Sequence, residues 1–219
     1  MEEHPEVFQN LFGERCKLHL DNRLRLKCSV PKQPERKVYR GNDLVNYQTM
    51  TIEDFHIINE VVIDRGPGST SIQLEMYFDG NYMTQMVGDG IIVSTPTGST
   101  AYNMSAGGSI VQANTQCICI TPLAPHSLSF RPLIIPVSTH IVLRKADDNR
   151  NSAWVSLDGG TRFELLPGEE LSIKGSEASL GMFVMPSDNL VDLWSQRLTH
   201  MLGWNKRDAL KPLQKKKND

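Results

Sequence analysis

The chain has 219 residues, enough for one large domain or for one domain and part of another. Lys and Arg total 23 against 25 Asp and Glu, so the net charge of -2 excludes nucleic-acid binding driven by whole-chain basicity. Hydrophobic residues make up 39% of the sequence, as in folded domains and unlike disordered or fibrous chains. These values predict a globular, soluble protein.

The sequence shows no sign of secretion or membrane insertion. No segment approaches the roughly 18 apolar residues of a membrane helix, and the start, Met-Glu-Glu-His-Pro-Glu, lacks the regions of a signal peptide. The four cysteines, Cys16, Cys28, Cys117 and Cys119, form no Cys-x-x-Cys pair and have no His at metal-finger spacing. We therefore expect reduced thiols, a cytoplasmic location, and neither a membrane nor a nucleic-acid partner.

In the first part of the chain, the hydropathy pattern is mixed at the N-terminus and becomes typical of β-strands from residue 24 onward. Residues 1–20 combine charged and apolar positions and predict one helix. Residues 24–30 alternate apolar and polar side chains, as in a half-buried strand. Residues 31–50 contain prolines without a clear period and predict a loop, whereas the apolar, β-branched run 55–63 predicts a single strand.

Strand signals then follow one another closely. Residues 72–78 alternate, and Asp79-Gly80 predicts a two-residue hairpin turn that places Met76 opposite Met83. Further short runs have strand character: 90–94, 117–121, 133–137, 140–145, 153–158, 162–166, 170–174 and 181–185. Their regular spacing predicts a mainly β fold, an antiparallel β-sandwich, over residues 21–187.

One short helix is expected inside this sandwich. Ser99 or Thr100 is suited to cap its first turn, and the pattern extends toward Val111 although Gly107 and Gly108 weaken it. We therefore predict a helix directly after the Gly-rich segment that precedes it.

A second helix is expected at the C-terminal end. The segment 188–204 carries apolar residues at three-to-four spacing over 190–202, with Ser187 or Asp188 as the cap and a glycine after the last turn. Residues 205–219 are rich in lysine and predict a flexible basic tail.

The densest cluster of small and polar residues is Gly88-Asp-Gly-Ile-Ile-Val-Ser-Thr-Pro-Thr-Gly-Ser-Thr-Ala-Tyr102. It predicts a turn, a buried strand and a hydroxyl-rich loop before a helix start, where free amides attract phosphate or other polar groups. The Lys of a Walker loop and the third Gly of a dinucleotide fingerprint are both missing. The segment is either a ligand site or a structural joint.

Asn59 and Glu60 are adjacent polar residues inside an apolar run. Neighbouring strand residues point to opposite faces, and a buried polar group without a partner costs about 2 kcal/mol or more. A ligand and an internal hydrogen-bond network satisfy this requirement equally well. Asp158-Gly159-Gly160 predicts a hairpin turn, with a ligand-facing Asp158 as the alternative.

A hydrolase is not favoured by the remaining polar cluster. Residues 125–132 bring together a His, two Ser and an Arg. No Gly-x-Ser-x-Gly sequence surrounds these serines and no acid can be assigned, so a Ser-His-Asp triad is not indicated.

Three motifs in this order resemble the NAD kinase family: Ile58-Asn-Glu-Val-Val-Ile63, the segment Gly88–Tyr102, and His126-Ser-Leu-Ser-Phe-Arg-Pro132. The resemblance covers residues 20–205, and the amino-acid sequences of segments 61–67 and 151–159 resemble those of the eukaryotic cytosolic branch of the family. It implies an NAD-binding C-terminal β-sandwich domain. It also implies phosphorylation of the adenosine 2′-hydroxyl of NAD to give NADP, with ATP and a divalent metal such as Mg²⁺, in a homo-oligomer with shared sites.

The resemblance also assigns substrate-binding residues, and it assigns neither a catalytic residue nor a metal ligand to this chain. Asn59 would hydrogen bond the adenosine end of NAD, and the Tyr102 ring would pack on the ligand. Asp89 would approach the nicotinamide side from a neighbouring subunit. The full set implied for NAD is Asn59, Glu60, Asp89, Thr97, Thr100, Ala101, Tyr102 and Ser105.

One family motif is missing from the sequence. The family's N-terminal α/β domain carries a Gly-Gly-Asp-Gly sequence whose Asp serves as general base, and these 219 residues contain none. We therefore expect the C-terminal part only, with residues 1–20 as a linker from a missing N-terminal domain and little kinase activity by this chain alone. The alternative is a non-catalytic NAD- or NADP-binding or regulatory subunit that pairs with a complete kinase.

Overall fold

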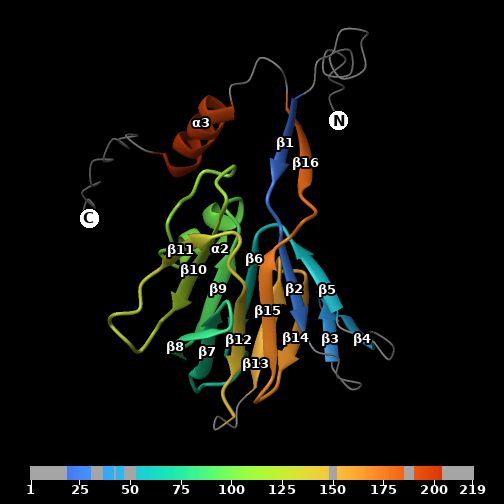
Figure 1. The fold of residues 1–219 in the computed structure, drawn as a ribbon, viewed down its shortest axis with the longest axis vertical. Helices are drawn as coiled ribbons and strands as arrows, with labels where there is room; N and C mark the ends of the chain where they lie inside the picture. The colour runs from blue at the N-terminus through green and yellow to red at the C-terminus, as the bar shows by residue number, and fades with distance from the viewer. Residues whose placement is uncertain are drawn as a thin grey trace, which may run out of the picture. The chain divides into compact units, whose positions relative to one another are not determined.

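The computed structural model describes residues 19–30, 37–41, 43–46, 53–147, 152–184 and 190–203 (Figure 1). The chain divides into two compact units, one of residues 20–183 and one of residues 1–19 and 184–219. The larger unit carries all three motifs. Several predicted features lie outside the described residues: nearly all of the N-terminal helix, Cys16, the caps Ser187 and Asp188, and the basic tail.

The larger unit is built from two antiparallel sheets, which confirms the mainly β class. The eight-stranded sheet has the order β11 (Leu133–Pro136), β10 (Cys117–Leu123), β9 (Gly90–Ser94), β6 (Glu60–Asp64), β13 (Ala153–Leu157), β14 (Thr161–Leu165), β3 (Lys37–Arg40) and β4 (Asp43–Asn46). The six-stranded sheet has the order β5 (Glu53–Ile57), β2 (Leu26–Val30), β15 (Glu170–Gly175), β12 (Ile141–Lys145), β7 (Ile72–Phe78) and β8 (Asn81–Gly88). A separate two-stranded ribbon pairs β1 (His19–Arg23) with β16 (Leu180–Val184).

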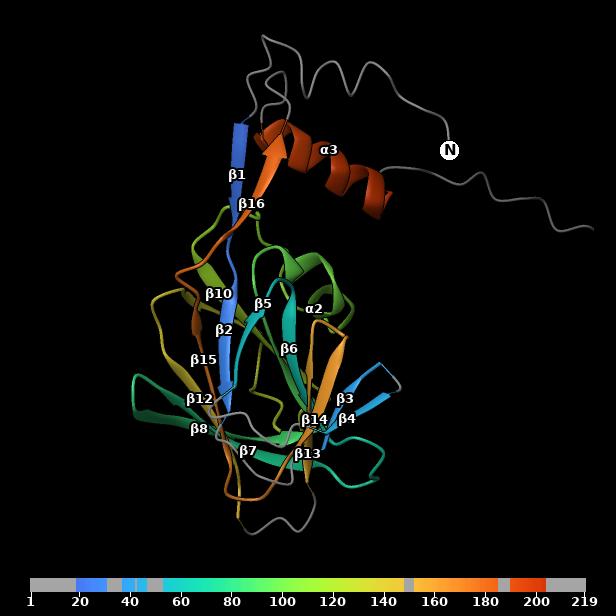
Figure 2. The same ribbon diagram turned by 90° about the vertical axis from the view of Figure 1, so that its right-hand side faces the viewer.

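One continuous apolar core lies between the two sheets. Figure 2 shows β2, β15 and β12 in one layer and β6, β13 and β14 in the other. Buried and half-buried positions alternate along β2, β7, β12 and β13, because successive strand residues face opposite sides. Both layers supply fully buried side chains to the core, among them Val61, Ile63, Ile91, Val155, Leu26, Leu74, Leu143 and Ile173. The free cysteines of the described part, Cys28, Cys117 and Cys119, are also buried, and burial raises the pKa of Cys119 to about 12.

The prediction of a loop over residues 31–50 is wrong for residues 37–40 and 43–46. β3 and β4 form a hairpin there, and Gly41 between them has a φ of 59°. Val38 is the residue of β3 that reaches the core, with 1% of its surface exposed. A strand of four residues, Lys37-Val-Tyr-Arg40, is too short for apolar and polar alternation to reveal it.

The run 55–63 is two strands rather than one. β5 belongs to the six-stranded sheet and β6 to the eight-stranded sheet, so the chain crosses between the layers at Ile58 and Asn59. The run 55–63 is mainly apolar on both sides of the crossing, so its hydropathy gives little sign of the change of sheet. The polar Asn59 marks it.

The Asp79-Gly80 hairpin has the predicted turn but a different register. Both residues have a positive φ, 50° and 79°, as a two-residue turn between twisted strands requires. A register shift between Met76 and Tyr77 places Met76 opposite Thr84, so the predicted pairing with Met83 is wrong. The shift is a β-bulge, which the hydropathy pattern does not encode.

The internal helix is much shorter than predicted. A 3₁₀ turn, η1 (Gly98–Thr100), leads into α2 (Tyr102–Ser105), and neither is capped by a side chain. Gly107, with a φ of 82°, turns the chain away before Val111 can join a helix. A helix of four residues also has too small a dipole to create the expected anion site at its start.

The C-terminal helix is confirmed as α3 (Leu190–Leu202). Gly203 follows it with a φ of 60°, and its N–H donates to the carbonyl of Thr199 at 3.0 Å. No helix in the described ranges is long and apolar enough to cross a membrane.

Candidate functional site

Asn59 and Glu60 stand at the crossing between the two sheets, where a single carboxylate holds the backbone. Asp158, in the turn between β13 and β14, accepts the N–H of Ile58 on Oδ2 at 2.8 Å. Its Oδ1 accepts the N–H of Asn59 at 2.7 Å and that of Glu60 at 3.1 Å. Both oxygens of Asp158 therefore bind backbone amides, and the hairpin prediction captured only part of its role.

The segment after β9 docks on the other side of the same corner. The Thr95 N–H donates to the Asn59 carbonyl at 2.9 Å, and the Thr95 hydroxyl donates to the Ile58 carbonyl at 2.6 Å. The Gly98 N–H donates to the Thr95 hydroxyl at 3.0 Å. A Cβ on Gly98 would lie 2.2 Å from the Asn59 carbonyl oxygen, so this approach requires glycine.

A buried polar network fixes the chain around α2. The Asn103 amide donates to the carbonyls of Ser99 and Ser109, both at 3.1 Å, and accepts the Thr121 hydroxyl at 2.7 Å. The Ser99 hydroxyl donates to the Val111 carbonyl at 3.1 Å and accepts the Val111 N–H at 2.9 Å. Ser99 and Asn103 are 0% exposed, so their polar groups serve the fold.

Other residues of this segment remain accessible. Tyr102 is 46% exposed, and Ser105 is also exposed. Thr97, Thr100 and Ala101 are half-buried. The Thr97 hydroxyl oxygen is itself buried and has no hydrogen-bond partner among the described residues. These are the residues of the segment to which the sequence assigned ligand contacts.

Glu60 is a buried carboxyl group with unused acceptor capacity. It is only 9% exposed, and its Oε2 has no hydrogen-bond partner within the described ranges. Burial raises the pKa of Glu60, the negative charge of Asp158 raises it further, and a hydrogen bond from the Tyr102 backbone amide opposes both effects. Glu60 thus joins the corner to the start of α2 and keeps one oxygen for a further donor.

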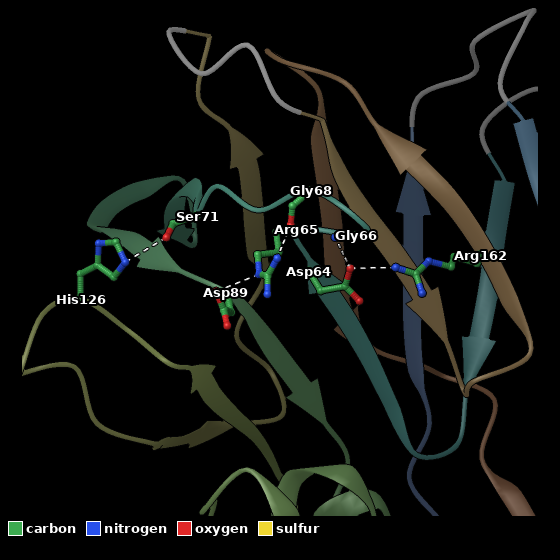
Figure 3. Close-up of polar contacts among 8 residues, drawn as sticks. All are labelled: Asp64, Arg65, Gly66, Gly68, Ser71, Asp89, His126 and Arg162. Carbon is green, nitrogen blue, oxygen red and sulfur yellow. Dashed lines mark hydrogen bonds and ion pairs between the residues drawn. The ribbon is translucent and has the colours of Figure 1, made fainter.

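A pocket of about 660 Å³ lies near this corner, and it contains Asp89 and Tyr102 of the same chain. Its other lining residues are Asp64, Arg65, Gly66, Pro67, Leu123, Ala124 and Arg162. Figure 3 shows two ion pairs there: Arg65 Nε lies 3.0 Å from Asp89 Oδ1, and Arg162 Nη2 lies 2.8 Å from Asp64 Oδ1. The pairs neutralise the acids of the pocket.

Asp89 is fixed by backbone contacts as well as by its ion pair. The Arg65 N–H donates to the Asp89 carbonyl at 3.0 Å, and the Asp89 N–H donates to the Leu123 carbonyl at 2.9 Å. Gly88 permits the second contact, because a Cβ there would lie 2.9 Å from the carbonyl oxygens of Leu123 and Ala124. The Gly-Asp-Gly turn therefore sets Asp89 at the end of β6 and β10.

The sequence reasoning missed Asp64, Arg65 and Arg162. The first two had a signal, since they are a charged pair that ends the apolar β6 just before Gly66. Arg162 had none: its guanidinium lies 5.3 Å from the Trp154 ring centroid on the neighbouring strand, a contact made only by sheet pairing.

The third motif reaches this region through His126, whose backbone N–H donates to the Val87 carbonyl at 2.8 Å. His126 Nε2 lies 2.9 Å from the Ser71 hydroxyl (Figure 3). Across the part of the chain that the structure describes, no three His, Cys, Asp or Glu side chains come together as metal ligands. No residue in the described ranges is therefore assigned as a ligand of the divalent metal that the family resemblance implies.

Comparison with known proteins gives concordant matches. A family model, the ATP-NAD kinase C-terminal domain, matches residues 58–184. The ATP-NADH kinase YEF1 of Saccharomyces cerevisiae is 36% identical over 207 residues, which cover 94% of this chain and 41% of that protein. The NAD(+) kinase of Saccharomyces cerevisiae is 37% identical over 208 residues, 94% of this chain and 38% of that protein. The chain therefore spans less than half the length of either relative.

A solved structure matches the fold over nearly the whole chain. The crystal structure of yeast NADH kinase complexed with NADH superposes with a TM-score of 0.77 and 30% identity, covering 95% of this chain and 55% of that one. An NAD kinase from Archaeoglobus fulgidus in complex with ATP has a TM-score of 0.62 at 21% identity, which shows a shared fold.

Proposed function

The chain belongs to the ATP-NAD kinase family, and from this premise we propose that it supplies the NAD-binding part of an enzyme that makes NADP. The reaction transfers a phosphoryl group from ATP to the adenosine 2′-hydroxyl of NAD. Relatives named as NAD and NADH kinases support the reaction class, and a neighbour crystallised with NADH supports the ligand class. The observation that carries the proposal is the unfilled acceptor of Glu60 at a corner made by two family motifs.

Each proposed contact follows from the chemistry of the site. The free Oε2 of Glu60 suits a ribose hydroxyl donor, since a carboxylate is a strong acceptor where water is scarce. The exposed ring of Tyr102 offers a flat surface on which a base can stack. Asn59 would bind the adenosine end of NAD. The other residues proposed to line the NAD site are Thr97, Thr100, Ala101 and Ser105.

Asp89 is proposed to bind the nicotinamide side of the substrate. Its carboxylate is oriented by Arg65 and borders the pocket that Tyr102 also lines. Contribution of Asp89 to the site of a neighbouring subunit remains part of this proposal, together with homo-oligomeric assembly and a cytoplasmic location.

The phosphoryl-transfer step needs groups that these residues do not supply. The sequence contains no Gly-Gly-Asp-Gly, the motif whose Asp is expected to act as general base. Binding of ATP and a divalent metal is therefore proposed for the full-length context. The same observation supports the second candidate, a non-catalytic NAD- or NADP-binding or regulatory subunit that pairs with a complete kinase.

Titration calorimetry of NAD into the purified chain tests the binding site. Asn59→Ala and Tyr102→Ala are each expected to weaken binding about tenfold, the effect of losing one well-placed polar or stacking contact. Tyr82→Ala is the matched control, since Tyr82 is 60% exposed on β8 and belongs to no motif. Unchanged affinity in both site variants would refute the assignment.

An assay of NADP formation from NAD and ATP separates the two candidate roles. The purified chain is expected to form no NADP, and a mixture with a complete family kinase shows whether it changes that enzyme. NADP formation by the chain alone, at a rate typical of kinases, would refute the proposal that this chain only binds NAD and that catalysis needs further groups.

A further inference from the structure

Two Asp-Gly hairpin turns in the described part of the chain have closely similar φ angles. Asp79-Gly80 joins β7 to β8, and Asp158-Gly159 joins β13 to β14. The aspartates have φ values of 50° and 46°, and the glycines after them have values of 79° and 65°. In each turn the Asp N–H donates to a carbonyl of a neighbouring segment, that of His140 at 2.8 Å or that of Glu60 at 3.0 Å.

The two carboxylates accept different numbers of backbone amides. Asp79 Oδ1 accepts one backbone amide, that of His140, at 2.9 Å. Asp158 accepts three consecutive amides, those of residues 58–60. Both acceptors are carboxylates, so the difference lies in number: three hydrogen bonds hold the corner at residues 58–60 and one holds His140.

Asp158 and Thr95 hold the corner from its two sides. The amides at positions 58–60 go to Asp158, whereas the carbonyls of Ile58 and Asn59 go to Thr95. Without the carboxylate, the amides at the crossing lose their acceptor while the carbonyl contacts remain. The backbone angles at Asn59 and Glu60 then have fewer restraints, and these angles decide where the two side chains point.

We propose that Asp158 is a positioning residue of the dinucleotide site, which orients Asn59 and Glu60 through their backbone amides without touching the ligand. The inference rests on the proposed function, because it assigns Asn59 and Glu60 to ligand binding. It extends that function by adding a residue 98 positions from Glu60 in the sequence.

Two substitutions isolate the carboxylate from the turn. Asn tolerates a positive φ, so Asp158→Asn keeps the turn; its Oδ1 can still accept from Asn59 and Glu60, but its amino group opposes the Ile58 N–H. Asp158→Gly removes the acceptor altogether and is also free of backbone strain. Asp79→Asn and Asp79→Gly make the same changes in the control turn.

Calorimetry with NAD and thermal unfolding of the four variants test the proposal. We expect Asp158→Asn to weaken NAD binding about tenfold and Asp158→Gly more, whereas both Asp79 variants bind within about twofold of wild type. If Asp158→Gly fails to fold, Asp158→Asn decides the outcome. A folded Asp158→Asn with wild-type affinity would overturn the proposal, and so would equal losses of affinity in the Asp79 and Asp158 variants.

The pH dependence of NAD affinity supplies a readout that general destabilisation does not move. Asp158 is the charged side chain facing Glu60, and the Tyr102 amide is the other group that shifts its titration. Asp158→Asn removes a negative charge, so the acid midpoint of binding is expected to move to lower pH, while Asp79→Asn leaves it in place. Failure of wild type to bind NAD at all would instead refute the proposed function.

Discussion

Two sets of residues in the segment from Gly98 to Ser105 can be compared directly. Ser99 and Asn103 are fully buried, and their polar atoms bind the backbone of the chain and the Thr121 hydroxyl. Tyr102 and Ser105 lie on the same two short turns but are exposed. Neighbours in this segment therefore alternate between buried groups that serve the fold and exposed groups that are available to a ligand, because successive residues of a helical turn face different directions.

This comparison limits what a motif match can assign. The sequence resemblance names Thr97, Thr100, Ala101, Tyr102 and Ser105 as binding residues, and each of them has accessible surface. The equally prominent Ser99 and Asn103 have none. Burial and hydrogen-bond partners, rather than membership of the motif, separate the two sets, and mutations in each should separate stability from binding.

The largest effect is expected for Gly98→Ala. The alanine Cβ would lie 2.2 Å from the Asn59 carbonyl oxygen, so the backbone at the corner must move. We expect this to lower the free energy of unfolding by about 3 kcal/mol and to disrupt the proposed NAD site. Urea denaturation measures this loss. Gly160→Ala is the control, since the nearest atoms to its Cβ lie 4.0 Å away. A Gly98→Ala variant as stable as Gly160→Ala would show that the corner is loosely packed.

Asn103→Ala is expected to have the next largest effect on stability. It removes three hydrogen bonds from a site that is 0% exposed, which predicts a loss of about 2 to 3 kcal/mol. Ser105→Ala, on the exposed side, is expected to change stability by less than about 0.5 kcal/mol. Equal unfolding free energies for the two variants would remove the distinction between the two sets.

Glu60→Gln is expected to have a smaller effect on stability than Gly98→Ala or Asn103→Ala, and an effect of the opposite sign. Because the pKa of Glu60 is raised, the folded state favours the protonated carboxyl, and stability is lost as pH rises from the ordinary carboxyl range through the raised pKa. The neutral Gln removes this loss, so the variant should gain less than about 1 kcal/mol at neutral pH and show a flatter stability profile over that window. Unfolding measured across pH 4 to 7 checks the slope.

The same substitution should weaken NAD binding about tenfold, because a neutral amide replaces a charged acceptor. Stability and affinity would then move in opposite directions, as expected where a group is retained for a ligand at the expense of the fold. Parallel losses of both would assign Glu60 to the internal network instead.

Much of the fold and part of the site follow from local sequence patterns. Alternation of apolar and polar residues located strands such as β2 and β7, and Asp-Gly pairs located the turns after β7 and β13. Gly203 marked the end of α3. The Asn59-Glu60 pair and the segment ending at Tyr102 were found as candidates from their unusual polarity and their resemblance to a family. Each of these signals lies within a few residues along the chain.

What the tertiary structure decided depends on contacts between distant residues. The change of sheet at Ile58 and Asn59 does not follow from the hydropathy of a mainly apolar run, and the register shift between Met76 and Tyr77 depends on the partner strand. The polar network around α2 joins Asn103 to Thr121, and Asp158 reaches Glu60 across 98 positions. Local propensity fixes which segments extend or coil, whereas packing decides which of their polar groups are satisfied internally and which remain for a ligand.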